Sequence, residues 1–160
     1  MNAFTLFHVF LSIIGIATGL VVMAGLLSGK VMRAWTAIFL ATTVATSVTG
    51  FFFPFHKLLP AHIVGIISLV VLTIAIVARY AFNLRGAWRW MYVVTVATAL
   101  YLNVFVGVVQ AFEKIPSLRA LAPKQSEPPF LITQLAVLIL FITVGVFATT
   151  RFHIAVPREG

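Results

Sequence analysis

Two histidines lie near the starts of two different apolar segments of this sequence. His8 is close to the start of the segment 4–27, and His62 is close to the start of the segment 61–82. Imidazole is a common ligand of haem iron and of divalent transition metals. Two imidazoles that share a metal need ring nitrogens about 4 Å apart, twice a metal–nitrogen bond of about 2 Å. His8 and His62 are therefore candidate ligands of a b-type haem or a divalent metal. The alternative is that both rings only occupy the headgroup interface, which suits amphipathic side chains.

Other polar residues fall close to the same ends of the apolar segments. His56, in the short connection 54–60, and Glu113, at the end of the segment 87–112, are weaker candidates for a metal site. Three uncharged polar residues are candidates to line a polar cluster: Asn103, Gln110 and Gln134. Polar groups within a lipid-embedded segment are costly and often mark functional sites.

Composition determines the class of protein that positions these residues. The chain has 160 residues, of which 62% are hydrophobic and 9% charged, against about 45–50% and about 25% in an ordinary soluble domain. This excludes a soluble globular fold, and it excludes disorder, which requires low hydrophobicity. The absence of cysteine excludes disulfides, iron–sulfur clusters and thiol chemistry.

Five apolar segments are each close to the length of about 20 residues that a membrane-crossing helix needs: 4–27, 34–53, 61–82, 87–112 and 129–150. They are continuous, whereas the strands of a membrane barrel are shorter and alternate in polarity. The sequence therefore predicts an all-α integral membrane protein, with five transmembrane helices in one domain over residues 1–160. The connection around 115–122 has apolar residues at helical spacing, which predicts a short interfacial helix.

The distribution of basic residues predicts the orientation in the membrane. If the N-terminus is outside, the inner side receives Lys30, Arg33, Arg79, Arg85, Arg89, Arg151 and Arg158, and the outer side receives Lys57, Lys114, Arg119 and Lys124. This agrees with the positive-inside rule, and three tryptophans at the inner boundary fit an aromatic belt: Trp35, Trp88 and Trp90. The formal charge of +8 is scattered over helix ends, so it does not indicate a nucleic-acid surface.

The first two apolar segments resemble the next two. His8-Val9 corresponds to His62-Ile63, Ala34-Trp35 to Ala87-Trp88, and the sequence TVAT at 43–46 recurs at 95–98. These matches occur in the same order, which predicts a duplicated two-helix hairpin with copies at about 4–53 and 61–112. The expected architecture is a four-helix bundle with the fifth helix, about 129–150, packed outside it, as in parallel repeats of some transporters.

Three functions remain open from the residues alone. The specific hypothesis is a redox, electron-transfer or cofactor-handling protein that binds haem b or a metal on its outer, periplasmic face. The second is a non-catalytic accessory or assembly subunit, in contact with other membrane proteins or with copies of itself. The third is a component of a small-solute or proton transporter. The sequence contains no nucleophile–base motif, phosphate loop or H-E-x-x-H motif, so it gives no support for a hydrolase.

The segments 35–56 (WTAIFLATTVATSVTGFFFPFH) and 125–130 (QSEPPF) resemble uncharacterised small multi-pass proteins of bacterial inner membranes. The resemblance implies a bacterial inner-membrane location but no particular chemistry. The layout of two hairpins with paired histidines is similar to that of duplicated haem-handling bundles of bacterial inner membranes. The sequence lacks a second histidine pair near the inner face. In this it departs from bundles that transfer electrons across the membrane through two haems.

Overall fold

The structure is a computed structural model that describes residues 3–53 and 60–153. Every regular element in these ranges is a helix, which confirms the predicted all-α class. The long helices are α1 (Ala3–Leu27), α2 (Arg33–Gly50), α3 (Pro60–Ile76), α4 (Trp88–Lys114) and α6 (Pro128–Arg151). A π-helical turn, η1 (Val77–Ala81), continues α3, and the predicted short helix between the fourth and fifth segments is α5 (Pro116–Leu121).

Four helical segments in the described ranges are long and apolar enough to cross a membrane: Ala3–Leu27, His62–Ala81, Trp88–Lys114 and Pro128–Arg151. The second of these combines α3 and η1. Large apolar side chains point outward along them, including Phe10, Ile132 and Leu140, each more than half exposed. Such a surface suits lipid and not water. The chain is therefore a membrane protein with at least four candidate spans. Helix α2 is not among the four, since its 18 residues include Arg33 and a series of threonines.

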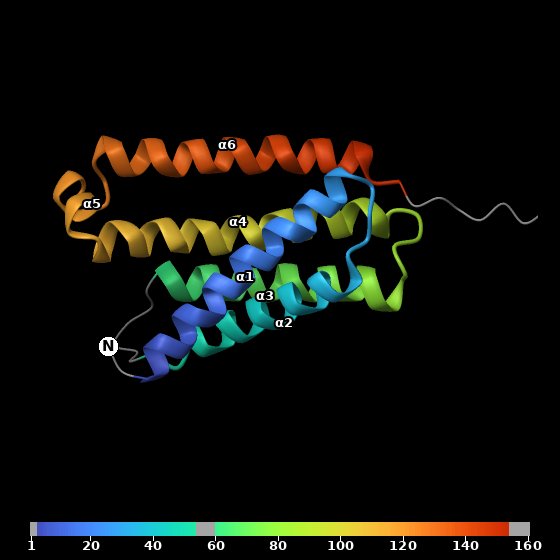
Figure 1. The fold of residues 1–160 in the computed structure, drawn as a ribbon, viewed down its shortest axis with the longest axis horizontal. Helices are drawn as coiled ribbons and strands as arrows, with labels where there is room; N and C mark the ends of the chain where they lie inside the picture. The colour runs from blue at the N-terminus through green and yellow to red at the C-terminus, as the bar shows by residue number, and fades with distance from the viewer. Residues whose placement is uncertain (1–2, 54–59, 154–160) are drawn as a thin grey trace, which may run out of the picture.

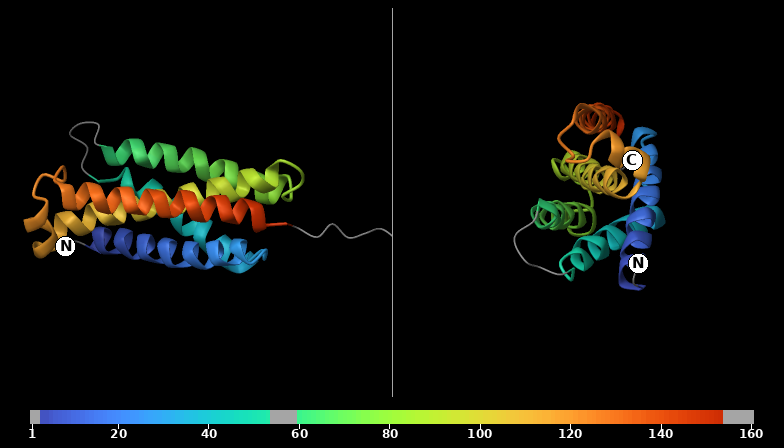
Figure 2. Two further views of the ribbon diagram at one scale, coloured as in Figure 1. Left: turned by 90° about the horizontal axis from the view of Figure 1, so that it is seen from above. Right: turned by 90° about the vertical axis from the view of Figure 1, so that its left-hand side faces the viewer.

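The helices α1 to α4 form a ring in which each helix packs against the next and α4 packs back on α1. Helix α6 lies outside this ring, mainly against α4 and to a smaller extent against α1 (Figures 1 and 2). The beginnings of α1, α3 and α6 and the ends of α2 and α4 lie at the end of the bundle where α5 is found (Figure 1). We call this the α5 end.

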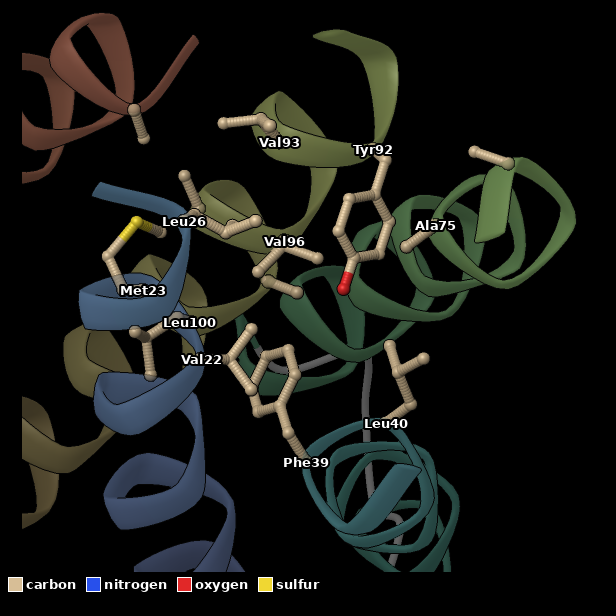
Figure 3. Packing of buried hydrophobic residues seen from close by; sticks show 14 of the residues in the cluster. Val22, Met23, Leu26, Phe39, Leu40, Ala75, Tyr92, Val93, Val96 and Leu100 are labelled. Carbon is tan, nitrogen blue, oxygen red and sulfur yellow. The ribbon is translucent and has the colours of Figure 1, made fainter. Parts of the chain in front are cut away.

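The core of the ring contains apolar side chains from each of the four helices. Val22, Phe39, Leu72 and Leu100 are essentially inaccessible to solvent, and Figure 3 shows how the labelled residues from α1, α2 and α4 converge. Gly19 allows a close approach between three helices, because a Cβ atom placed there would lie 2.6 Å from Leu100 Cδ1 and 2.8 Å from Phe39 Cε2. The missing side chain thus lets α1 lie directly on α2 and α4, as small residues do in membrane bundles.

Candidate functional site at the α5 end

His8 is half-buried in the first turns of α1 and faces the last turn of α2. Its Nδ1 atom lies 2.8 Å from Thr49 Oγ1. Its ring meets the ring of Phe53 edge-on, with centroids 5.1 Å apart. A Cβ atom at Gly50 would lie 3.7 Å from His8 Cε1, so the imidazole packs over an uncovered stretch of the α2 backbone.

The hydrogen bonds around Thr49 favour a proton on Nδ1 of His8. The Thr49 hydroxyl donates to the carbonyl oxygen of Ala45, at 2.7 Å, one turn earlier in α2, and Thr46 offers a second carbonyl at 3.1 Å. With its proton used in this way, the hydroxyl oxygen accepts a hydrogen bond from His8 Nδ1–H. The neutral imidazole then has an unprotonated Nε2. This is the nitrogen that would bind a metal, and the hydrogen bond on Nδ1 fixes the ring orientation.

His62 lies in the first turn of α3 and is only 7% exposed. Its ring centroid is 5.9 Å from that of Phe51, which directly follows α2. One turn before Phe51, Ser47 Oγ donates to Ser68 Oγ at 3.1 Å and joins α2 to α3. Both candidate ligands therefore contact the C-terminal residues of α2, one from α1 and the other from α3. Their surroundings differ, since His8 has a hydroxyl partner and His62 is enclosed beside an aromatic ring.

Asn103 and Gln134 are tied to neighbouring helices within the bundle. Asn103 Nδ2 donates to Thr43 Oγ1 at 3.1 Å, which connects α4 to α2. Gln134, which is 9% exposed, donates from Nε2 to the carbonyl oxygen of Phe105 at 3.2 Å and connects α6 to α4. The Oε1 atom of Gln134 is buried without a hydrogen-bond partner in the described part of the chain. Gln110 is exposed on α4. Asn103 and Gln134 therefore serve contacts between different pairs of helices, and the shared polar cluster stays a prediction.

A polar pocket of about 320 Å³ lies where α4, α5 and the loop before α6 meet. We call it the α5 pocket. It contains Glu113, which is exposed, together with three cationic residues and three others: Lys114, Arg119, Lys124, Phe112, Pro123 and Gln125. The distribution of basic residues predicts that these cations lie on the outer side, but their sharing of a pocket depends on the path of the loop and has no sequence signal.

The predicted metal ligands do not form a larger cluster in the described ranges. His56 lies outside the described residues, as do Lys57 and Arg158, so the structure says nothing of their contacts. Among the residues that the structure describes, no group of three His, Asp or Glu side chains is close enough to hold a metal ion. A site built on His8 and His62 would therefore be a two-histidine site within this part of the chain.

Thr49 is the residue of this site that the sequence analysis missed. It belongs to a threonine-rich helix in which no single hydroxyl is distinguished by the sequence. Its partner on α1 is determined by how α1 and α2 pack.

Comparison of the chain with models of protein families, with curated proteins and with solved structures finds no match.

Proposed function

We propose that this chain is a bacterial inner-membrane protein that binds haem b or a divalent metal through His8 and His62 at its α5 end. Its role would then lie in redox chemistry, electron transfer or cofactor handling. The observation that carries the proposal is the 2.8 Å contact between His8 Nδ1 and Thr49 Oγ1. The Thr49 hydroxyl is itself hydrogen-bonded to a backbone carbonyl of α2. Metal-binding imidazoles are characteristically held in this way through their second nitrogen.

The surroundings of the two histidines suit a bound cofactor. Phe51 and Phe53 contribute aromatic surface beside His62 and His8, respectively. Apolar surroundings of this kind exclude water and favour a flat, hydrophobic group such as haem. In a ring of four helices, α1 and α3 are diagonal, and side chains from facing helices of a bundle are the usual source of cofactor ligands.

The proposal includes a five-pass topology, with the α5 end outside and the C-terminus in the cytoplasm. Helix α2 packs between α1 and α3 (Figure 1), and this position in the ring supports a fifth pass. The described cations at the end opposite α5 outnumber those at the α5 end, as the positive-inside rule requires for a cytoplasmic face: Lys30, Arg33, Arg79, Arg85, Arg89 and Arg151. The ring of two hairpins is also the arrangement expected of a duplication.

The direct experiment is a visible spectrum and an elemental analysis of protein purified from cells supplied with haem. We expect either a Soret band or a stoichiometric metal, and its loss in His8→Ala and in His62→Ala. His153→Ala is the matched control, because His153 is exposed at the opposite end of the bundle. Protein without haem or metal, or a cofactor that both histidine variants retain, would overturn the proposal. Far-ultraviolet circular dichroism shows whether each variant keeps its helices.

One observation favours a second function, that of a non-catalytic accessory subunit. Only three residues of the 24 in α6 are buried: Phe130, Gln134 and Ala148. A helix with so little contact to its own chain can pack against another membrane protein as well as against lipid. Affinity purification in a mild detergent would identify such a subunit by a stoichiometric partner. Recovery of the chain alone, at the mass of one copy, would count against this function.

The third function, transport, receives less support from the interior. A Cβ atom at Gly15 would lie 3.2 Å from both Asn103 Nδ2 and Thr43 Oγ1. Helices α1, α2 and α4 therefore meet closely at this level. This close packing favours a solid bundle over a solute path past Asn103.

A further inference from the structure

The α5 pocket gathers positive charge at one corner of the molecule. Lys114 ends α4, Arg119 belongs to α5, and Lys124 lies in the loop that leads to α6. Segments that are separate along the chain thus bring three cations to the walls of one pocket of about 320 Å³. This volume lies at the lower end of the range of about 300–1,000 Å³ that is common for small-molecule sites.

The loop that carries Lys124 is held in place by contacts on both sides. Ala122 is fully buried against the rings of Phe112 and Phe130, whose centroids are 5.4 Å apart in an edge-on arrangement. Gln125 adopts a left-handed backbone, with φ of 55°. Its Nε2 atom donates to the carbonyl oxygen of Val109 at 3.0 Å, which anchors the loop to α4. Lys124 is therefore presented to the pocket by a fixed backbone.

The carboxylates nearby leave the three cations without a bonded partner. Glu127 accepts hydrogen bonds from the backbone N–H groups of Lys124, at 3.1 Å, and Ser126, at 3.0 Å, and its charge stabilises the loop. Glu113 lies in the pocket wall. Among the described residues, neither glutamate forms an ion pair with Lys114, Arg119 or Lys124. Three positive side chains against two negative ones leave the corner with a net positive charge.

The position of α5 places the pocket at the boundary of the membrane. Ile115 and Leu121 are 46% and 57% exposed at the two ends of this short helix, while Leu118 packs against the small core beneath it. A short helix that exposes apolar residues next to a basic one is typical of a segment lying in the headgroup region. With α5 in the headgroup region, the cations of the pocket would lie at the depth of lipid phosphates.

We propose that the α5 pocket binds a phosphate group, carried either by the headgroup of an anionic phospholipid or by a soluble phosphate. Arg119 offers the planar donor pair that fits two phosphate oxygens, and Lys114 and Lys124 add mobile positive charge. This pocket contains neither histidine, although the charge of Lys114 acts on His8. Variants of Arg119 and Lys124 therefore test it independently of cofactor binding.

Native mass spectrometry of the full chain in detergent tests the proposal with two lipids. Phosphatidylglycerol carries the phosphate, and diacylglycerol carries the same acyl chains without it. We expect adducts of phosphatidylglycerol only. Arg119→Gln and Lys124→Gln should each weaken them by about tenfold, the effect of one charge-assisted hydrogen bond. Arg85→Gln is the control, since Arg85 is exposed in the turn at the opposite end. Glu113→Gln should strengthen binding, because it removes a negative charge from the pocket.

A thermal-shift titration with inorganic phosphate distinguishes the two sources of the group. Saturable stabilisation by phosphate, lost in Arg119→Gln, together with no preference for phosphatidylglycerol, supports the soluble source. A lipid preference without a response to inorganic phosphate supports the headgroup. The proposal is overturned if neither ligand binds, or if Arg119→Gln and Arg85→Gln behave alike. The gain expected in Glu113→Gln protects the test from variants that simply fail to fold.

Discussion

His8 Nδ1 and Thr49 Oγ1 lie 2.8 Å apart across the contact between α1 and α2. The contact joins a candidate ligand to a helix whose own backbone carbonyls take the hydroxyl proton of Thr49. When the Thr49 hydroxyl donates to that carbonyl, the imidazole donates from Nδ1 and its Nε2 carries no proton and can bind a metal. An otherwise ordinary threonine thereby becomes the residue that positions the histidine.

Replacement of Thr49 by valine tests this positioning without a change in side-chain shape. The variant keeps the bulk against α1 but removes the acceptor of His8 Nδ1–H. We expect the affinity for haem or metal to fall by about 10–100-fold, the usual effect of losing such a partner. Titration of the cofactor-free protein, followed by absorbance or by calorimetry, gives the affinity.

Thr73→Val is the matched control for that substitution. Thr73 is exposed on α3, and its hydroxyl also donates to a carbonyl one turn earlier, that of Leu69, at 2.8 Å. The affinity of this variant should equal that of the unchanged protein. An unchanged affinity in Thr49→Val, or an equal loss in both variants, would contradict the role given to Thr49.

The hydrogen bond from Asn103 to Thr43 should stabilise the bundle by a small, measurable amount. Polar contacts between membrane helices contribute about 0.6 kcal/mol on average. A double-mutant cycle of Asn103→Ala and Thr43→Val should give a coupling free energy of about this size, measured by reversible unfolding in mixed micelles. If the effects of the two substitutions on the free energy of unfolding are additive, the hydrogen bond contributes nothing to it.

The helical segments could be predicted closely because each depends on a local pattern. The expected segments 87–112 and 129–150 correspond to Trp88–Lys114 and Pro128–Arg151. Pro128 and Pro129 occupy the first turn of α6, where a missing N–H group has no cost. The π-helical turn at Val77–Ala81 was not predicted, because its altered hydrogen bonds leave no distinct pattern in an apolar run.

The candidate site could be predicted in part. The sequence indicated that His8 and His62 lie near the same end of the molecule, and both contact the end of α2. Their different partners, Thr49 and Phe51, could not be predicted. Those partners depend on the angle at which α1 and α3 cross α2, which follows from packing around Gly19 and Gly65. Side-chain contacts between helices that are distant along the chain have no local sequence signal.

The loop before α6 should loosen in acid because of Glu127. Desolvation acts to raise the pKa of this carboxyl group, but the backbone N–H groups of Ser126 and Lys124 and the charge of Lys124 lower it below its usual value. A lowered pKa in the folded state means that the contribution of Glu127 to stability is complete above its ordinary pKa of 4.5 and is lost as the pH falls through the lower, folded value.

Hydrogen exchange measures this loosening at the two amide groups involved. Exchange of the Lys124 and Ser126 amides, corrected for intrinsic rates, should accelerate as the pH falls below the ordinary carboxyl pKa of 4.5 and through the lower, folded pKa. In Glu127→Gln the same amides should exchange faster at neutral pH and show no additional acid step. If the acid-induced acceleration of exchange persists in Glu127→Gln, a group other than Glu127 causes it.

Alanine at Gly19 should destabilise the bundle through overpacking. The added Cβ atom would lie 2.6 Å from Leu100 Cδ1 and 2.8 Å from Phe39 Cε2, which is closer than such atoms can pack. Both neighbours are fully buried, so relief requires movement of the helices. We expect the free energy of unfolding to fall by about 1–3 kcal/mol, the usual cost of overpacking.

Gly107→Ala separates that effect from the general influence of glycine on helices. Gly107 lies within α4, and a Cβ atom there would be 3.6 Å from Ile16 Cδ1, an ordinary contact. Because alanine favours the helix by about 1 kcal/mol over glycine, this variant should be as stable as the unchanged protein or more stable. A stability of Gly19→Ala equal to that of Gly107→Ala would mean that α1 does not approach α2 and α4 as closely as the structure shows.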